Sequence, residues 1–465
     1  MQASRFVALI APTVVGVVTA TAYTILSALQ WTSYTVLSWD LGIFTQLARA
    51  YASLQAPIVP IKGEGFNLLG DHFHPLLVAL GPIYAIFPSA FTLLVVQNLL
   101  FGLSAAVITV AATRQLGTIW GPLIGLAFGL SWGLQGAAEA QFHEIAFAVP
   151  LLAFSLSYFL RSRWLASALW AAPLVFVKED LGLTVLVMGL VLALRMRSVN
   201  HRHALQVGLG LAAWGLVWFV LASLVILPAL NPNGSWAYPS SIDPLALLSN
   251  PLSLFQPEKG MTLWLMLIIT GAIALRSPLV LIVLPTIAWR FLSGNEGYWG
   301  HTWQYSAVLM PVLFAAALDG IARARATSQT DGPAHLLARY SRYAPAVMVT
   351  AALTLLPTMP VAKLFDPSTH FATNAAGADE ALEMIPDDAV VETDIGLMSY
   401  LVDRTTVYYL GNPNPVPEYL VVDLAGGGLP AQWSSVEVVA ETLHPDATFT
   451  TIYTDGRYQV AERTN

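Results

Sequence analysis

The chain has 465 residues and a formal net charge of −7; 56% of its residues are hydrophobic and only 11% are charged. Soluble globular domains carry about 25% charged residues, so this composition excludes a water-facing surface over most of the chain. With no cysteine, disulfide frameworks, thiolate metal sites and cysteine nucleophiles are excluded as well.

The composition therefore predicts an integral membrane protein, and its mean hydropathy of +0.63 agrees. Phe6–Leu29 is long enough to cross a bilayer, which takes about 20 residues, and we interpret it as an uncleaved first helix. The shorter run Pro75–Phe87 predicts a partial or re-entrant helix. The other predicted spans are Ala90–Ala112, Thr118–Gly136, Ile145–Leu160, Leu165–Val177, Leu181–Leu194, Leu205–Leu227, Met261–Leu275, Pro278–Leu292, Trp303–Leu318 and Ala344–Leu364. We expect a mainly α protein, a polytopic bundle of about 11 transmembrane helices.

Arginines gather in alternate connections between these spans. They are Arg5, Arg114, Arg161, Arg163, Arg195, Arg197, Arg202, Arg276, Arg323, Arg325, Arg339 and Arg342. Basic connections stay in the cytoplasm, so the N-terminus is expected there and the segment after the last span is expected outside. The sequence thus predicts a multi-pass protein of the plasma membrane.

The composition changes after the last span. Residues 365–465 are rich in acids and in turn residues, and they contain short runs with strand character. These runs are Ala389–Thr393, Thr406–Leu410, Tyr419–Asp423 and Thr448–Tyr453, and Ala375–Met384 predicts a helix. We therefore divide the chain into a transmembrane domain, residues 1–364 with an outer first loop at 30–89, and a small extracytoplasmic α/β or α+β domain, residues 365–465.

Ionisable residues gather in the connections predicted to face outward. They are Asp40, Asp71, His72, His74, His143, Glu144, Lys178, Glu179, Asp180, Glu296 and His301. Ionisable groups at the membrane edge are costly and indicate function. Solvent-exposed loops need polar residues, and this alone explains acids such as Glu64 and Glu258. It explains Lys178-Glu179-Asp180 less well, because three charges in a short turn between apolar helices predict a polar cavity. Such groups can bind a divalent metal, act as a general base or hold a phosphate.

Asp40 begins a segment whose apolar residues recur at helical spacing up to Leu54, which predicts an amphipathic helix on the outer surface. The alternative for Asp40 is a plain helix cap. Phosphate-loop and zinc-protease motifs are absent from the sequence. The arginines are juxtamembrane and the chain is acidic, so we expect no nucleic-acid partner.

Several motifs carry a resemblance to a known family. They are Trp39-Asp-Leu-Gly-Ile-Phe, Gly70-Asp-His-Phe-His-Pro, Phe142-His-Glu, Lys178-Glu-Asp-Leu-Gly, Gln304-Tyr with Pro311, Ile385-Pro-Asp-Asp-Ala and Leu401-Val-Asp-Arg. Together they resemble the domain of unknown function 2079 family of bacterial and archaeal membrane proteins, over nearly the whole chain. That family looks like a relative of the GT-C superfamily of membrane glycosyltransferases.

The resemblance implies a GT-C-like fold and an inverting transfer of a sugar from a polyprenyl-phosphate donor to an extracytoplasmic acceptor, which is a cell-envelope glycan, lipid or protein. Asp40 would be the general base, and Asp71 with His72 a second catalytic or metal site. Lys178 and His301 would contact the donor phosphate, and Glu179 or Asp180 would orient the acceptor or a metal. The resemblance gives His74 no required role.

A divalent metal, Mg²⁺ or Mn²⁺, is a candidate cofactor, because GT-C members differ in their need for one. Its candidate ligands are Asp71, His72, His143 and Glu144. Two other functions stay open: a transporter or flippase, and a non-catalytic assembly or binding protein on a GT-C-like scaffold. A transporter typically shows charges in mid-span, inverted repeats and broken helix pairs. Here the charges gather at span ends on one face.

Overall fold

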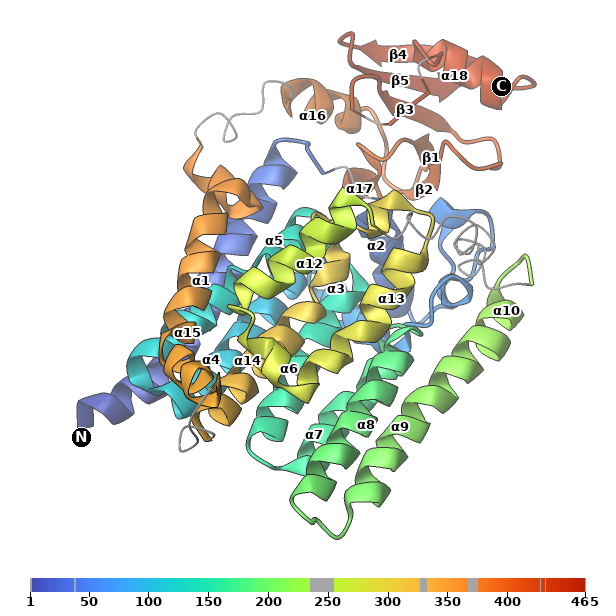
Figure 1. The fold of residues 1–465 in the computed structure, drawn as a ribbon. Coiled ribbons are helices and arrows are strands. Elements are labelled where there is room, and N and C mark those ends of the chain that lie inside the picture. The colour runs from blue at the N-terminus through green and yellow to red at the C-terminus, as the bar shows by residue number, and fades with distance from the viewer. Residues whose placement is uncertain are drawn as a thin grey trace.

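The computed structural model describes residues 2–36, 39–234, 255–326, 333–366, 375–426, 428–430 and 432–464. It is a helical bundle with a small sheet domain at one end, and the N-terminus lies toward the opposite end (Figure 1). The helices of the bundle are α1 Gln2–Thr32, α2 Trp39–Ala52, α3 Leu80–Ile86, α4 Ala90–Gly129, α5 Trp132–Glu139, α6 Ala148–Leu160, α7 Trp164–Ala171, α8 Leu181–Ser198, α9 Ala204–Leu221, α10 Leu227–Leu230, α12 Pro257–Ile269, α13 Leu284–Leu292, α14 Leu309–Ala326 and α15 Pro333–Leu355.

Within the described residues, five helical segments are long and apolar enough to cross a membrane: Ile10–Thr32, Ala90–Glu139, Leu181–Ser198, Ala204–Leu230 and Gln304–Ala326. Other predicted spans are shorter or interrupted helices. Pro173 lies in the 3₁₀ segment Ala172–Phe176 inside one of them. Pro285 lies where the 3₁₀ segment Pro278–Val283 meets α13 inside another. Proline has no N–H to donate, so it interrupts regular α-helix at both places. The predicted polytopic bundle is confirmed. Fewer of its described helices reach membrane-spanning length than the predicted number of about eleven spans.

The long segment α4 is a helical hairpin. Gly117 has φ +89°, a conformation that favours glycine. Beyond it the chain runs back along itself, since a Cβ on Gly121 would meet Thr113 and one on Gly125 would meet Thr109. The hairpin therefore accounts for two of the predicted spans, Ala90–Ala112 and Thr118–Gly136.

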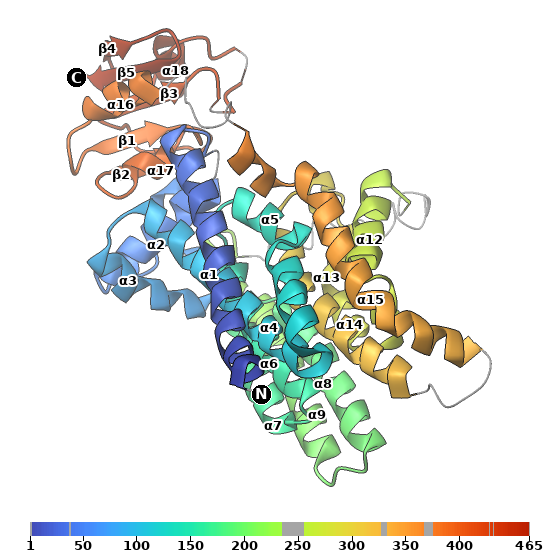
Figure 2. The same ribbon diagram turned by 90° about the vertical axis from the view of Figure 1, so that its left-hand side faces the viewer.

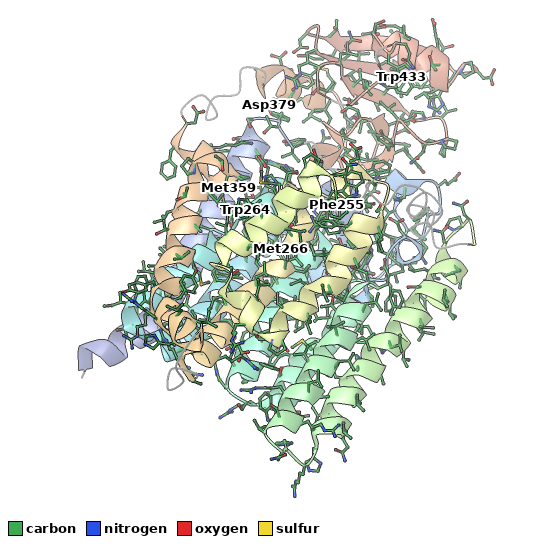
Figure 3. All side chains as sticks on the ribbon, viewed as in Figure 1. Phe255, Trp264, Met266, Met359, Asp379 and Trp433 are labelled. Atoms are coloured by element: carbon green, nitrogen blue, oxygen red, sulfur yellow. The ribbon has the colours of Figure 1, made fainter. Side chains whose placement is uncertain are left out.

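Apolar side chains cover the outside of the bundle. Phe255 is 81% exposed and Trp264 is 57% exposed, and both lie at α12 (Figure 3). Exposed apolar side chains at this density suit lipid rather than water. The bundle is thus the membrane domain of the protein.

The C-terminal domain is built on a five-stranded sheet in the order β2-β1-β3-β5-β4. Its strands are β1 Val390–Thr393, β2 Thr406–Tyr409, β3 Tyr419–Asp423, β4 Phe449–Thr454 and β5 Tyr458–Arg463, and its helices are α16 Ala375–Glu383, α17 Met398–Leu401 and α18 Val436–Leu443. β2, β1 and β3 are parallel, whereas β5 is antiparallel to β3 and β4. The mixed sheet confirms the predicted small domain of helices and strands; β5 and α18 were not predicted.

Helix α2 does not lie on an outer surface as the sequence suggested. Nine of its fourteen residues are buried, and its apolar side chains belong to one core cluster with those of α3, α16 and α17. Figure 2 shows the C-terminal domain above α2. The amphipathic spacing is real, but both faces of the helix are covered by protein, so the surface placement was wrong.

Candidate functional site

A cavity of about 540 Å³ opens in the bundle at the end that carries the C-terminal domain. Its wall is made by the start of α2, the connection between α2 and α3, the turn before α6, the turn before α8 and residues of α9, α13 and the segment before α14. The ionisable residues on the wall are Asp40, Lys62, Asp71, His72, His74, His143, Glu144, Lys178, Glu179 and Asp180. The aromatic residues are Trp39, Phe44, Phe219, Trp289, Tyr298 and Tyr305.

Most of these charges are paired across the cavity wall. Three ion pairs join segments that are distant in the sequence: His143 with Asp40 at 3.2 Å, His72 with Glu179 at 2.8 Å and Lys178 with Glu144 at 2.7 Å. A fourth, Lys62 with Asp71 at 3.1 Å, lies within the connection between α2 and α3. A buried charge is tolerated when it is paired and hydrogen-bonded. The pairing explains how so many ionisable groups fit at the edge of an apolar bundle.

The pair of Asp40 and His143 fixes the protonation of both groups. His143 Nδ1 lies 3.0 Å from the carbonyl oxygen of Gln141, which only accepts hydrogen bonds, so Nδ1 carries a proton. Nε2 faces the Asp40 carboxylate and must also donate, which makes His143 an imidazolium. Burial alone would lower the pKa of His143, but the charge and hydrogen bond of Asp40, together with the charge of Glu144, raise that pKa.

Asp40 is held as a carboxylate that remains accessible. Burial opposes its charge, yet the attraction and hydrogen bond of His143 lower the pKa of Asp40 below its usual value. The Asp40 side chain is 49% exposed, whereas that of His143 is 5% exposed. Since Asp40 lines the cavity, its carboxylate is available to a molecule that enters.

Glu179, in the turn before α8, contacts the connection between α2 and α3. Its Oε1 atom pairs with His72, and its Oε2 atom accepts a hydrogen bond of 3.0 Å from the backbone N–H of Phe73. Burial opposes the charge of Glu179, but the charge and hydrogen bond of His72, together with the charge of Lys178, lower its pKa to about 2. The Phe73 ring stacks on Trp218 of α9 with 5.7 Å between centroids. These contacts hold the motifs around His72 and Lys178 against each other.

Asp180 is the carboxylate of the cavity wall that stands outside the four pairs. Burial raises its pKa to about 6, and its buried Oδ1 atom has no hydrogen-bond partner among the described residues. His74 is 1% exposed, and burial lowers its pKa to about 4, so it is neutral at physiological pH.

Several polar atoms of the cavity wall have no partner in the described part of the chain. They are Trp39 Nε1, His74 Nδ1, Asp180 Oδ1, Trp289 Nε1 and Gln304 Oε1. A buried polar atom without a partner costs about 1–3 kcal/mol, and native proteins keep few of them. Donors and acceptors gathered beside aromatic rings at one cavity are typical of a site that binds a polar ligand.

A buried arginine organises the aromatic side of the cavity. Arg290 is fully buried and donates to the carbonyl oxygens of Tyr298 and Gly300, at 2.7 and 2.6 Å, and to Ser306 Oγ at 3.1 Å. The rings of Trp289, Tyr298 and Tyr305 contact one another edge-on, with centroids 5.0 to 5.7 Å apart. The arginine thus fixes the loop that presents this aromatic cluster.

The structure brings together nearly all the site residues proposed from the sequence. Asp40, Asp71, His72, His143, Glu144, Lys178, Glu179 and Asp180 line the one cavity. His301 does not line it; its ring lies edge-on to Trp132 with 6.3 Å between centroids. Glu296 is exposed and also outside the cavity. The assignment of phosphate contact to His301 therefore lacks geometric support.

The proposed metal ligands do not form a metal site in this arrangement. Within the described ranges, no three His, Asp or Glu side chains are placed to hold a metal ion. Asp71, His72, His143 and Glu144 each pair with a different side chain instead. A requirement for Mg²⁺ or Mn²⁺ stays a prediction.

Other cavity residues were given no role by the sequence analysis, although Trp39, Gln304 and Tyr305 stand in the family motifs. Lys62, Trp39, Trp289, Gln304 and Tyr305 line the wall, and no role was predicted for them. Lys62 is one of only a few lysines in the chain and lies 5.5 Å above the Trp39 ring. In a chain with 11% charged residues, the rarity of lysine was the signal that could have singled it out.

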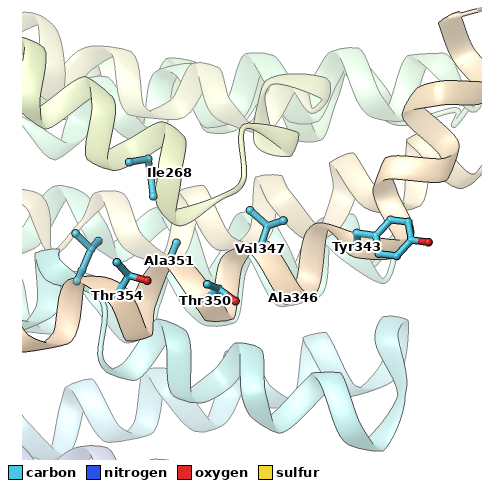
Figure 4. A pocket seen from close by; sticks show the side chains of 8 residues that line it. Ile268, Tyr343, Ala346, Val347, Thr350, Ala351 and Thr354 are labelled. Atoms are coloured by element: carbon cyan, nitrogen blue, oxygen red, sulfur yellow. The ribbon is translucent and has the colours of Figure 1, made fainter.

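A second hollow on the bundle has a different character. It is a groove lined by Ile268 of α12 and by Tyr343, Ala346, Val347, Thr350, Ala351, Thr354 and Leu355 of α15. Figure 4 shows these mostly small or apolar side chains along α15. None of the described residues that line this groove is charged, which suits a lipid-facing surface rather than a site of catalysis.

Comparison of structures shows the same architecture in another membrane protein. The crystal structure of ArnT from Cupriavidus metallidurans bound to undecaprenyl phosphate has a TM-score of 0.55 and 15% sequence identity over 94% of this chain and 97% of that chain. The apo structure of the same protein has a TM-score of 0.49 and 14% identity over 95% and 98%. The first likeness, at this identity, is one of fold, and it confirms the expected GT-C-like scaffold.

Sequence comparison gives the family. No curated protein matches the chain. The match to the family described as predicted membrane protein, DUF2079, extends over residues 30–462, nearly the whole chain, and confirms the resemblance found in the motifs. The chain is therefore a member of the DUF2079 family of membrane proteins.

Proposed function

We propose that this protein is a membrane glycosyltransferase of GT-C type that transfers a sugar from a polyprenyl-phosphate donor to an acceptor outside the cytoplasm. One observation carries the proposal. The first-loop carboxylate Asp40 shares a single cavity with Lys178, Glu179 and Asp180, at the end of a GT-C-like bundle. The reaction needs a polar pocket at the membrane edge, because the donor has its sugar in water and its chain in lipid.

Asp40 is suited to act as the general base. Its carboxylate is ionised through its pair with His143 and is accessible from the cavity. In the proposed reaction, the acceptor hydroxyl gives its proton to Asp40 while its oxygen forms a bond to the anomeric carbon of the sugar. The bond from that carbon to the phosphate oxygen breaks, and polyprenyl phosphate leaves with the electron pair. A carboxylate in hydrogen-bond reach is what such proton transfer requires.

Lys178 and Lys62 are suited to receive the phosphate. Both ammonium groups line the cavity, and each is paired with a carboxylate, Glu144 and Asp71 respectively. Cations at the leaving group stabilise the negative charge that develops there. The pairing holds each cation in position before the donor arrives. The ArnT crystal structure contains undecaprenyl phosphate, which makes a lipid phosphate of this class the first ligand to test.

The orientation of the protein follows from its arginines. We place the N-terminus in the cytoplasm, so the cavity and the C-terminal domain face the outside of the plasma membrane. The protein's partners are then the lipid bilayer, a polyprenyl-phosphate sugar and a cell-envelope acceptor.

The direct test is Asp40→Asn in purified protein supplied with a panel of polyprenyl-phosphate sugars and an envelope extract as acceptor. Loss of a general base typically lowers the rate about 10²–10⁴-fold, and we expect a decrease in kcat of that size. Glu64→Gln is the matched control, because Glu64 is an exposed acid of the same loop outside the cavity. Undiminished transfer by Asp40→Asn would remove Asp40 as the base.

A binding measurement separates the base from the phosphate site. Undecaprenyl phosphate should raise the melting temperature of the wild type and of Asp40→Asn, because a ligand of the folded state stabilises it by mass action. Lys178→Met should lose most of that increase. Inorganic phosphate at the same concentration is the control for the contribution of the lipid chain. An equal increase in Lys178→Met would show that Lys178 does not hold the phosphate.

A further inference from the structure

One face of helix α2 lines the cavity, and another face contacts the C-terminal domain. Asp40, Ile43 and Phe44 lie on the cavity wall. Trp39, Gly42, Gln46 and Arg49 recur at helical spacing, and each of them contacts the C-terminal domain. These four residues are called the docking stripe below. A single short helix therefore joins the cavity to the C-terminal domain.

Gln46 lies at the centre of the docking stripe and connects three parts of the chain. Its Nε2 group donates to the carbonyl oxygen of Val407 in strand β2 at 2.9 Å, and its Oε1 atom accepts from the N–H of Ile61 at 3.0 Å. The side chain is 7% exposed. Both halves of one amide are thus used, one by the C-terminal domain and one by the connection that carries Lys62.

Arg49 and Gly42 of the docking stripe also lie in direct contact with the C-terminal domain. Arg49 donates to the carbonyl oxygens of Val402 and Thr405, at 3.3 and 2.7 Å, just after α17. Gly42 packs closely against α17, since a Cβ there would lie 2.9 Å from the sulfur of Met398. Arg49 and Gly42 thus place α2 in direct contact with α17 and the turn that follows it.

The end of the docking stripe reaches the cavity itself. The Trp39 ring packs on that of Tyr409 with 4.7 Å between centroids, and Trp39 also lines the cavity beside Asp40. Just beyond β2, Asn412 donates to the carbonyl oxygen of Ile61 at 2.8 Å. Contacts of the C-terminal domain thus flank the helix turn that carries the candidate base.

We propose that the C-terminal domain is a positioning element for Asp40: by binding the docking stripe of α2 it fixes the carboxylate in the cavity wall, and Gln46 is the positioning residue at the centre of this contact. The docking can be tested by itself, whereas its meaning for catalysis rests on the proposed function. The C-terminal domain is then part of the active-site architecture, whether or not it also binds a ligand.

The chain has no cysteine, which allows a direct measurement of docking. Ala48 of α2 is fully buried, so the single thiol of Ala48→Cys reacts with a water-soluble maleimide only when the helix opens. Adding Gln46→Met leaves the carbonyl oxygen of Val407 and the N–H of Ile61 without these bonds, and Arg49→Met has the same effect beside α17. Each should accelerate labelling at position 48 of the full-length protein by roughly tenfold or more, the change that loss of a buried hydrogen bond produces.

Two matched substitutions control for damage to the C-terminal domain alone. Gln459→Met removes a glutamine that accepts from the N–H of Val436, and Arg463→Met removes an arginine that donates to the carbonyl oxygen of Val416. Neither bond involves α2, so labelling at position 48 should stay at its starting rate. Equal labelling in the docking-stripe variants and in these controls would overturn the proposal. If Gln46→Met does not fold, Arg49→Met decides the question by itself.

Transfer kinetics then test the positioning role. Gln46→Met should lower kcat with little change in KM for the donor, and adding Asp40→Asn should cost much less than it does in the wild type, because the carboxylate is already displaced. Faster labelling with unchanged kcat would refute positioning. If the wild type transfers no sugar, the proposed function fails, while the labelling rates still decide whether the domain holds α2.

Discussion

At the scale of single residues, the cavity is organised by charge pairing. Each of the four pairs has one member in the first loop or in the turn before α6 and the other in a distant turn or along the same loop. Buried ion pairs add little net stability, because desolvation offsets the attraction, but breaking one leaves an uncompensated charge. The pairs therefore act mainly to place the cavity's functional groups.

Asp180 gives a prediction on stability that needs no activity assay. Burial raises the pKa of this carboxyl from 3.8 to about 6. Between these values the folded chain holds a proton that the unfolded chain has released, so stability falls as the pH rises through this interval. Above it the folded protein carries the full cost of the buried charge. Asp180→Asn removes the charge at nearly constant size. It should raise the melting temperature by a few degrees at pH 8 and change it little at pH 4.

Differential scanning calorimetry of the wild type and Asp180→Asn in the same detergent measures both melting temperatures and checks this expectation. Glu64→Gln, which alters an exposed acid, should give no such pH-dependent difference. If Asp180→Asn lowers the melting temperature at pH 8, Asp180 is ionised and paired in the fold, contrary to the structure.

At the scale of elements, close glycine contacts set the packing of the bundle. Gly189 and Gly208 let α8 and α9 approach, since a Cβ on Gly208 would lie 2.4 Å from that of Ala193. Gly16 and Gly102 do the same for α1 and α4. Small residues at such crossings are typical of membrane helices, where packing rather than the hydrophobic effect holds helices together.

This packing predicts opposite outcomes at two neighbouring glycines of α9. Gly208→Leu inserts a side chain where the backbone of α8 lies and should destabilise the protein by roughly 1–3 kcal/mol or more. Gly210→Leu should be nearly neutral, because a Cβ at that position would have no described atom within 4 Å apart from the adjoining backbone of α9 itself. Thermal unfolding in detergent measures both. Similar losses at the two positions would show that α8 and α9 do not pack as described.

At the scale of the whole molecule, the bundle and the C-terminal domain share one core. Leu41 and Phe44 of α2 belong to the same buried cluster as Val391 and Val407 of the sheet. Tyr400 donates to the carbonyl oxygen of Trp31 at 2.9 Å and packs on its ring. The cavity lies within the bundle, and the bundle and the C-terminal domain pack as one body through this shared core.

The orientation of the protein in the membrane can be measured by labelling single introduced cysteines in intact cells. Glu441→Cys, an exposed position of α18, should react with a membrane-impermeant maleimide from outside, because the arginine pattern places the C-terminal domain there. Arg202→Cys, exposed between α8 and α9, should react only after the membrane is permeabilised. The reverse pattern would invert the topology and remove the extracytoplasmic acceptor from the proposed function.

Much of this protein was predictable from local sequence. Apolar runs located the helices, since a bilayer admits only segments that satisfy their own backbone, and alternating runs located β1 to β4. The strand β5 follows Asp455 and Gly456, a turn signal that would have predicted a hairpin with β4. The span count was less predictable, because proline inside an apolar run interrupts the regular helix, as at Ala172–Phe176 and at the start of α13.

The sequence by itself determined that this is a membrane protein and that a charged turn at Lys178 needs a polar cavity. It also predicted most of the ionisable residues that line that cavity; among its predictions, Glu296 and His301 are the exceptions. It did not determine the partners. That Asp40 meets His143, that Lys62 meets Asp71, and that α2 is covered on both faces were decided by the tertiary structure. The physical reason is that periodicity records only which face of an element avoids water, whereas the pairing of buried charges depends on how distant segments pack.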